Sequence, residues 1–350
     1  MAKQKKLSKS QSRRIRANHS KRLKKAQLTQ TEEELQTGQL GPQSFGQVIT
    51  RYGQHADIEN SEGDIIRCNI RRTIDSLVCG DNIIWRPYTQ SDSEFAGVIE
   101  AVEPRSSEFV RPDFYDGLKP VASNIDQILI VSALLPDLTP NIIDRYLVAV
   151  EQLDITPVIV INKMDLLSEN NKELVEKTIE LYQEIGYQVV TLSAKQEDGV
   201  EVVHQLLKDK TSVFVGQSGV GKSSLVNAIM PEVNIATKQV SDNSRLGQHT
   251  TTASRLYRLE HGGSVIDSPG VREFAMWHLE NEQILNGFVE FRPFLNQCKF
   301  RDCKHQKDPG CALKQAIKEG QVSEQRYQSY LRILQTVTDI TLRHQPKDSK

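Results

Sequence analysis

The 350-residue sequence lacks the features of a membrane protein or of a disulfide-stabilised one. Its longest apolar stretch, residues 128–135, is too short to span a bilayer. The basic N-terminus has no hydrophobic segment of the kind found in secretory signals. The five cysteines are an odd number and too few for a disulfide framework, which favours a reducing compartment. We therefore expect a cytoplasmic protein with no membrane association.

The net charge of −1 conceals a separation of charge along the chain. Residues 1–25 contain eleven Lys and Arg and no acidic residue, and residues 298–350 contain eleven basic and six acidic residues. The rest of the chain holds 22 basic and 39 acidic residues. Basic ends around an acidic middle indicate a polyanionic partner that both ends contact.

The first part of the chain divides into a polar segment and a β-rich one. Residues 1–44 have too little apolar content for a core, which predicts a basic disordered tail and a linker. Residues 45–107 contain short β-prone runs separated by glycines, which predicts a small barrel or a sandwich. These runs lie at 46–51, 65–71, 82–88 and 97–102. An oligonucleotide-binding barrel would suit the arginines of this segment, which are Arg67, Arg71, Arg72 and Arg86.

Residues 108–280 alternate strand-length apolar runs with helical stretches, which is typical of an α/β domain with a parallel sheet. The strand-length runs lie at 128–131, 158–161, 189–192 and 213–215, the helical stretches at 142–153 and 172–185, and a hairpin at 255–267. Residues 281–350 are predicted to be mostly helical around a cysteine-rich segment, with an apolar face on the helix 323–343. That face carries Tyr327, Tyr330, Leu331, Leu334, Val337 and Ile340.

A phosphate-binding loop follows the run at 213–215. It consists of Gly216, Gln217, Ser218, Gly219, Val220, Gly221, Lys222 and Ser223, with Ser224 next in the chain. The glycines let backbone N–H groups converge on phosphate oxygens at a helix N-terminus. Lys222 is predicted to contact the β- and γ-phosphates, and the Ser223 hydroxyl to ligate Mg²⁺.

Two further motifs indicate that the base is guanine. Asn162, Lys163, Met164 and Asp165 follow one predicted strand, and Ser193, Ala194 and Lys195 follow another. The Asp165 carboxylate can accept hydrogen bonds from guanine N1–H and the 2-amino group, a pair that adenine does not offer. Asn162 can bond the other edge of the base, the Lys163 stem can cover its plane, and the Ala194 N–H can meet guanine O6. With the phosphate-binding loop, these motifs predict a GTP site.

The γ-phosphate end of the site is predicted from two segments after the phosphate-binding loop. Asp267 and Gly270 belong to an Asp-x-x-Gly element, in which Asp267 holds Mg²⁺ through water and the Gly270 N–H contacts the γ-phosphate. Thr250, Thr251 and Thr252 are candidates for a threonine that ligates Mg²⁺ only in the GTP state, and the sequence does not decide among them.

The order of these motifs is permuted. The Asn-Lys-x-Asp and Ser-Ala-Lys elements precede the phosphate-binding loop here, whereas they follow it in an ordinary GTPase. Such a cut falls in loops, so the sheet is expected to survive with different chain ends. The segment after Gly270 then leads directly into the C-terminal region.

Four candidate metal ligands lie within fourteen residues of one another: Cys298, Cys303, His305 and Cys311. Three thiolates and an imidazole suit a closed tetrahedral zinc site that stabilises a segment too short to build its own core. Arg301, Lys304 and Lys307 surround it and are candidates for RNA phosphate contacts. Cys68 and Cys79 are far away in the sequence and are expected to be buried thiols.

The permuted order, the run from Gly247 to Thr252, the Asp267–Gly270 element and the Cys/His cluster resemble the bacterial ribosome small-subunit-dependent GTPase A family. The resemblance covers nearly the whole chain, including Arg111 to Gly117. It implies an oligonucleotide-binding barrel, a circularly permuted GTPase domain, a C-terminal zinc domain and a role in late assembly of the 30S ribosomal subunit through its 16S rRNA. It also implies that His249 positions the attacking water, because Val271 stands where Ras-like enzymes have a glutamine.

Two other functions stay open at the level of the sequence. The chain can be an RNA-binding assembly scaffold with a structural GTP site, or a regulatory GTPase with a protein partner. The complete catalytic motifs count against the first and the basic tail against the second. No long heptad pattern indicates a coiled-coil dimer, so we expect a monomer that binds GTP, GDP and the 30S subunit, with Mg²⁺ and one structural zinc ion.

Overall fold

The computed structural model describes residues 39–89, 94–113, 117–231, 254–268 and 279–344. The described residues fall into two compact units, which divide between Arg105 and Ser106. The predicted basic tail, residues 1–25, lies outside the described residues. None of the helices that the structure describes is both long and apolar enough to cross a membrane.

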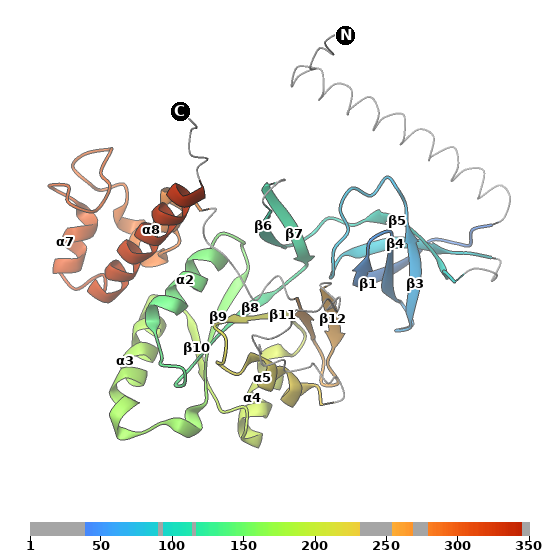
Figure 1. Cartoon of the computed structure of the whole chain (residues 1–350), viewed down its shortest axis with the longest axis horizontal. Helices are drawn as coiled ribbons and strands as arrows, with labels where there is room; N and C mark the ends of the chain where they lie inside the picture. Colours follow the sequence, from blue (N-terminus) through green and yellow to red (C-terminus); the bar gives the residue numbers. More distant parts are fainter. Residues whose placement is uncertain (1–38, 90–93, 114–116, 232–253, 269–278, 345–350) are drawn as a thin grey trace, which may run out of the picture. The chain divides into compact units, whose positions relative to one another are not determined.

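The first unit contains a closed five-stranded barrel (Figure 1). Its strands are β1 (Ser44–Tyr52), β2 (His55–Asn60), β3 (Ile65–Ile70), β4 (Asn82–Pro87) and β5 (Gly97–Val102). They follow the order β1-β2-β3-β5-β4, and β4 pairs with β1 to close the sheet. Inward-facing side chains such as Val48, Ile58 and Ile99 are buried in its core. Because the pairing of β4 with β1 closes the sheet, this unit is a barrel and not a sandwich, the two alternatives that the sequence left open.

Three of the four barrel arginines singled out in the sequence lie beside acids. Arg67 binds Asp57 at 2.8 Å, and Arg86 binds Glu100 at 2.9 Å. Arg71 lies 3.8 Å from the same Glu100 carboxylate. Of the four arginines singled out in the sequence, only Arg72 has an exposed side chain without a recorded ion pair among the described residues. Each of these three arginines meets its acid across strands, where the sequence separation hides the partner.

The second unit begins with a hairpin, β6 (Glu108–Asp113) and β7 (Gly117–Ser123), followed by a mostly parallel sheet. The sheet strands are β8 (Gln127–Ala133), β9 (Thr156–Asn162), β10 (Gln188–Thr191), β11 (Thr211–Gly216), β12 (Arg255–Arg258) and β13 (Ser264–Asp267). Their order in this unit is β10-β9-β8-β11-β13-β12, and only β12 runs antiparallel to its neighbour β13. The motif-bearing strands β9, β10 and β11 therefore end at the same edge of the sheet.

Helices cover both faces of this sheet (Figure 1). They are α2 (Pro140–Val150), α3 (Glu169–Ile185), α4 (Glu197–Leu207) and α5 (Lys222–Ile229), with a 3₁₀ turn, η1, at Met164–Leu166. Leu206 of α4 and Leu225 of α5 pack with Leu129 and Val160 of the strands in one buried cluster. α2 starts with a proline, whose fixed φ suits the first helical turn, and Gly186 ends α3 with a φ of +105°.

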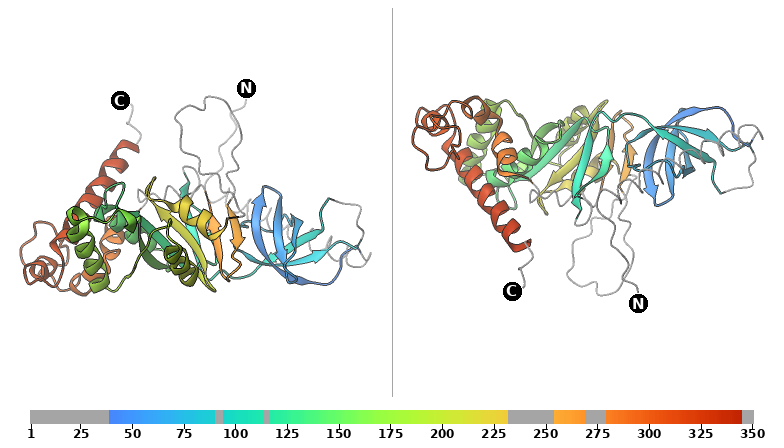
Figure 2. Two further views of the ribbon diagram at one scale, coloured as in Figure 1. Left: turned by 90° about the horizontal axis from the view of Figure 1, so that it is seen from below. Right: turned by 90° about the horizontal axis from the view of Figure 1, so that it is seen from above.

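The C-terminal segment has a core of its own that includes part of α2. Its elements are α6 (Asn281–Asn286), η2 (Val289–Phe294), α7 (Ala312–Lys318) and α8 (Glu324–His344). Phe288, Phe291 and Tyr330 pack here with Val148 and Ala149 of α2. α8 contacts α2 and α6, and in both views of Figure 2 it is the long red helix near the C-terminus.

A buried arginine joins α8 to the sheet domain. Arg326 of α8 is fully buried and contacts Asp144 of α2, while its other nitrogens bind Glu290 of η2 at 2.6 and 3.1 Å. Tyr182 of α3 donates to the same Asp144 carboxylate at 2.5 Å, and the Arg326 guanidinium lies 4.5 Å from the Phe288 ring centroid. Burial lowers the pKa of Arg326, but the two carboxylates outweigh it and hold that pKa above its usual range. This cluster therefore fixes α2, α3, η2 and α8 together.

Candidate functional site

The phosphate-binding loop connects β11 to α5, as the sequence predicted. Gly216 has a φ of +141°, and a Cβ there would lie 2.2 Å from the Val131 carbonyl oxygen of β8. Gly221 has a φ of +97°, and a Cβ there would lie 2.4 Å from Asn162 Nδ2. Both positions therefore require glycine, one against the neighbouring strand and one against the next motif. Lys222 Nζ donates to the carbonyls of Gly216 and Gln217, each at 2.7 Å.

Asn162 connects the three predicted motifs at the edge of the sheet. Its Nδ2 donates to the Val220 carbonyl at 2.9 Å, and its Oδ1 accepts from the Ala194 N–H at 3.1 Å. Its side chain is buried. The Ala194 N–H, expected at guanine O6, is directed at Asn162 in this structure. The amide thus sets the spacing between the phosphate-binding loop and the segment Ser193–Lys195.

Lys163 crosses the phosphate-binding loop. Its Nζ donates to the carbonyls of Gly219 and Leu135, each at 2.6 Å. Its φ of +64° turns the chain so that this side chain points back across the loop while Asp165 follows in η1. Leu135 and its neighbour Pro136, which lies close to Gly219, were missed by the sequence analysis. The sequence signal that could have identified them is the apolar pair followed by a proline directly after β8.

Asp165 is held as an accessible carboxylate. Ser193 Oγ donates to its Oδ1 at 2.6 Å, and Lys195 Nζ lies 3.7 Å from its Oδ2. The hydrogen bond from Ser193, aided by the Lys195 charge, lowers the pKa of Asp165. The side chain is 23% exposed. An ionised carboxylate at the rim of the site can accept two hydrogen bonds from a ligand while Ser193 fixes its orientation.

The remaining nucleotide residues fall in two groups. Met164 binds the end of β10 through its N–H, which donates to the Leu192 carbonyl at 3.2 Å, and Ser218, Ser223 and Ser224 lie in the loop and in α5. Asp267 ends β13, which pairs in parallel with β11 and so places it at the same edge as Gly216. His249, Thr250, Thr251, Thr252 and Gly270 lie outside the described residues.

The second candidate site is a cluster of three cysteines and a histidine. We refer to residues 298–311, which contain the cluster, as the metal knot. The sulfurs of Cys298, Cys303 and Cys311 lie 3.5, 3.8 and 3.5 Å from His305 Nδ1. Cys298 Sγ and Cys311 Sγ are 4.0 Å apart. Ligands at about 2.3 Å (S) and about 2.0 Å (N) from a tetrahedral ion lie roughly 3.5 to 3.8 Å from one another, so the four atoms fit a metal ion.

The histidine of this cluster is positioned by its backbone. His305 has a φ of +57°, and the Tyr327 hydroxyl of α8 donates to its carbonyl at 2.7 Å. Burial lowers the pKa of His305, which favours the neutral ring that a metal needs. The other two cysteines, Cys68 and Cys79, are buried as expected, and burial raises the pKa of Cys68 to about 12.

Comparison with known proteins decides the family. The family model for the RsgA GTPase matches residues 102–277. This chain belongs to the RsgA GTPase family. A relative from Shewanella oneidensis named small ribosomal subunit biogenesis GTPase RsgA is 56% identical over 341 residues, which cover 97% of this chain and 96% of that one. A protein of the same name from Pectobacterium atrosepticum is 54% identical over 97% of each chain.

Two solved structures resemble this family member along most of its length. The crystal structure of YjeQ from Thermotoga maritima is 32% identical, with a TM-score of 0.69, and covers 85% of this chain and 99% of that one. YloQ, described as a circularly permuted GTPase, is 30% identical, with a TM-score of 0.67, and covers 85% and 96%. The predicted fold class is confirmed: a circularly permuted P-loop GTPase with an N-terminal barrel and a C-terminal Cys₃His cluster able to hold a metal.

Proposed function

We propose that this RsgA GTPase family member hydrolyses GTP and that its nucleotide state controls its binding to the small ribosomal subunit during late maturation. The observation that carries the nucleotide site is the position of Asn162, whose amide ties the phosphate-binding loop to the Ser193–Lys195 segment. The ribosomal role rests on the name of relatives that are more than half identical over nearly the whole chain.

Asp165 selects the base in this proposal. Its carboxylate accepts from guanine N1–H and the 2-amino group, and Ser193 keeps it oriented and ionised. Adenine does not offer this pair of donors, and a carboxylate left without partners in a closed site costs about 1–3 kcal/mol or more. Lys163 covers the base with its stem, and Asn162, Met164, Ala194 and Lys195 complete this half of the site.

The phosphates are held by backbone N–H groups from Gly216 to Ser224 and by Lys222. Mg²⁺ bound with the nucleotide neutralises charge on the β- and γ-oxygens. The residues that we propose to hold it are Ser223, Asp267 and one of Thr250, Thr251 and Thr252. Gly270 contacts the γ-phosphate through its N–H, so the segment that follows it responds to the loss of the γ-phosphate when GTP is hydrolysed.

His249 orients the attacking water, since Val271 has no polar atom for that role. A loop histidine is effective only when its loop is ordered. Turnover is therefore slow in the free protein and rises on the small subunit.

The zinc, domain and partner assignments complete the proposal. Cys298, Cys303, His305 and Cys311 bind one structural zinc ion, for which the ligand separations support a tetrahedral site. The domains are a tail and linker (1–44), an oligonucleotide-binding barrel (45–107), the GTPase domain (108–280) and a zinc-binding helical domain (281–350). The protein acts as a cytoplasmic monomer and contacts 16S rRNA.

One experiment separates this proposal from its alternatives. GTP and ATP turnover is measured with and without purified 30S subunits, and subunit binding is titrated with salt. We expect GTP-specific turnover that the subunit stimulates, with salt-sensitive binding. Binding without turnover would support an RNA scaffold, and turnover unaffected by subunits would support a GTPase with a protein partner.

A further inference from the structure

The metal knot exposes an aromatic ring that no core explains. Phe300, between Cys298 and Cys303, is 45% exposed and takes no part in the hydrophobic core of the C-terminal segment. Lys299 Nζ lies 5.5 Å from its ring centroid. Burying such a side chain would gain about 1.5–3 kcal/mol, a stabilisation that most of this exposed ring does not contribute to folding.

Hydrogen bonds to the backbone order the loop that carries this ring. The Lys299 N–H donates to the Gly310 carbonyl at 3.0 Å, and the Cys303 N–H donates to the Phe300 carbonyl at 3.4 Å. Asp308 Oδ2 accepts from the N–H groups of Lys304 and Gln306, at 3.1 and 3.4 Å. A loop ordered before binding loses little conformational entropy when a ligand arrives.

The segment that carries the ring is rich in positive charge. Five exposed cations lie on the knot and on α7, and none has an ion-pair partner among the residues that the structure describes: Lys299, Arg301, Lys304, Lys307 and Lys318. The same stretch holds three acids, the exposed Asp302 and Glu319 and Asp308, which accepts two backbone hydrogen bonds, so these five cations outnumber the acids. A polyanion is the ligand that this charge attracts.

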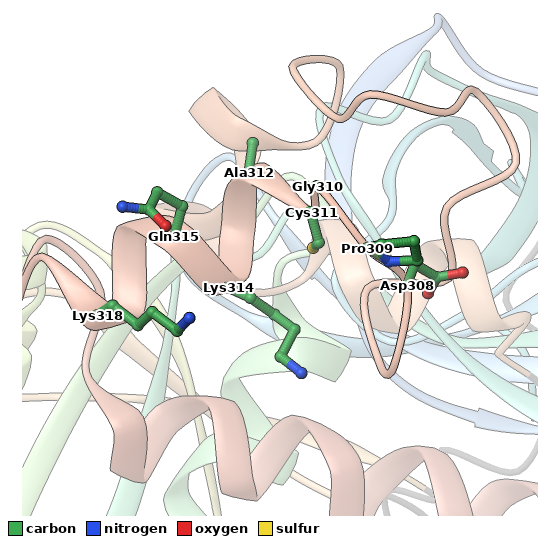
Figure 3. Close-up of a pocket in the computed structure, with 8 residues that line it drawn as sticks. All are labelled: Asp308, Pro309, Gly310, Cys311, Ala312, Lys314, Gln315 and Lys318. Atoms are coloured by element: carbon green, nitrogen blue, oxygen red, sulfur yellow. The ribbon is translucent and has the colours of Figure 1, made fainter.

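A cavity of about 460 Å³ lies between the knot and α7 (Figure 3). Lys314 and Lys318 project from one side of α7 along it, and Pro309 and Gly310 form another part of its wall. Gly310 adjoins Lys299, because a Cβ on Gly310 would lie 2.8 Å from Lys299 Cβ. The cavity thus continues from the base of the Phe300 loop and is large enough for part of a nucleotide.

We propose that Phe300 is a stacking platform for an unpaired RNA base, with the phosphates of adjoining nucleotides on the surrounding lysines and arginine. Unpaired nucleotides are recognised by this combination, because every base has a face that stacks on an aromatic ring. The inference rests on the proposed function, since it takes the small ribosomal subunit as the partner. It adds that the metal knot contacts single-stranded rRNA on that subunit.

The test uses the full-length protein and three variants, Phe300→Ala, Phe300→Leu and Phe300→Trp. Binding to an unpaired RNA oligonucleotide, to an RNA duplex and to 30S subunits is measured at fixed salt. We expect Ala and Leu both to weaken binding to the unpaired oligonucleotide and the subunit by about 10-fold, and Trp to retain it. Trp fluorescence should be quenched by the oligonucleotide in the Trp variant beyond any change in the parent protein. Duplex binding and free-enzyme turnover should not change.

The Leu variant distinguishes stacking from insertion into a protein. If the Phe300→Leu variant binds subunits like the parent protein while the Phe300→Ala variant does not, the contact is an apolar one with a protein and the proposal is overturned. Unchanged binding by the Phe300→Ala variant would also overturn it. Lys307→Ala is the matched charge control: it should make the salt slope shallower by about one, with the stacking effect intact. An unchanged slope would remove Lys307 from the site. The oligonucleotide arm reports on Phe300 even if the parent protein shows no subunit-stimulated turnover, so the two proposals fail separately.

Discussion

Asp165 illustrates how single residues around the nucleotide site are prepared by their neighbours. The hydrogen bond from Ser193 lowers its pKa, so the carboxylate is charged at neutral pH and loses its charge only when the pH falls through that lowered value. Protonation converts one acceptor oxygen into a donor. Base selectivity should therefore persist through mildly acidic conditions.

Replacing this carboxylate should change the preferred base. Asp165→Asn presents an amide where guanine requires two acceptors, and the mismatch should reduce GTP affinity about 100-fold, or about 2.7 kcal/mol. Xanthosine triphosphate has a carbonyl at position 2 that accepts from the new amide, so its affinity should rise. Calorimetry with both nucleotides measures this, with the exposed Glu176→Gln on α3 as control. Equal loss for both nucleotides would place Asp165 away from the base.

His249 should affect turnover without affecting binding. His249→Ala removes the group that orients water, so stimulated turnover should fall by about 10²–10⁴-fold while GTP affinity stays the same. Single-turnover assays with 30S subunits measure the rate, and nucleotide titration measures the affinity. His261→Ala, in the exposed turn between β12 and β13, is the matched control. Full stimulation of the His249 variant would assign the water to another residue.

At the level of elements, Arg326 connects helices that belong to different parts of the chain. It binds acids from α2 and η2 while lying on α8, and it sits on the same buried face as Tyr330 and Ile333. Removing a buried charged partner leaves the others without compensation, which is the costly way to break such a cluster.

Arg326→Met should therefore destabilise the second unit by about 3–5 kcal/mol. Denaturant unfolding followed by circular dichroism measures the change, with Arg332→Met on the exposed side of α8 as control. Adding Asp144→Leu removes one of the buried carboxylates that the loss of Arg326 leaves without a cation. The double variant should therefore be more stable than the Arg326→Met variant. A double variant that is less stable would show that Asp144 is held mainly by Tyr182.

The elements also show what the sequence could predict. Apolar runs such as Ile128–Val131 and Val158–Ile161 gave the strands β8 and β9, and the apolar face of α8 was confirmed at Tyr327, Tyr330, Leu334 and Val337. β2 was missed because its six residues include only two apolar ones, and the β6–β7 hairpin was not expected. The phosphate-binding loop was predictable because its glycines mark it locally.

Contacts between distant residues were not predictable in the same way. The residues around Arg326 in the sequence do not identify Asp144 as its partner. Lys163 contacts Leu135 because β8 and β9 are neighbouring strands. An arginine within an apolar helix face was the one local sign of the first contact.

For the whole molecule, the separation of charge makes the N-terminal tail a candidate for non-specific attraction to RNA. Deleting residues 1–25 removes eleven positive charges and should weaken 30S binding at moderate salt. The slope of log affinity against log salt should become shallower by about 0.7–0.9 for each phosphate that the tail no longer neutralises. GTP turnover of the free protein should not change. The matched control keeps the full chain length and replaces the eleven basic residues of the tail with Gln. If the salt slope is identical in both variants and in the parent protein, the tail takes no part in binding.

The reach of Arg326 has a consequence for how the protein is made. Synthesis runs from the N-terminus, so Asp144 emerges from the ribosome long before Arg326, which follows it by 182 residues. During that interval the carboxylate of α2 has Tyr182 as a neighbour but no cation opposite it. In a nascent chain, this carboxylate meets its arginine only after α8 has been translated, so the last helix completes a unit whose sheet was made much earlier.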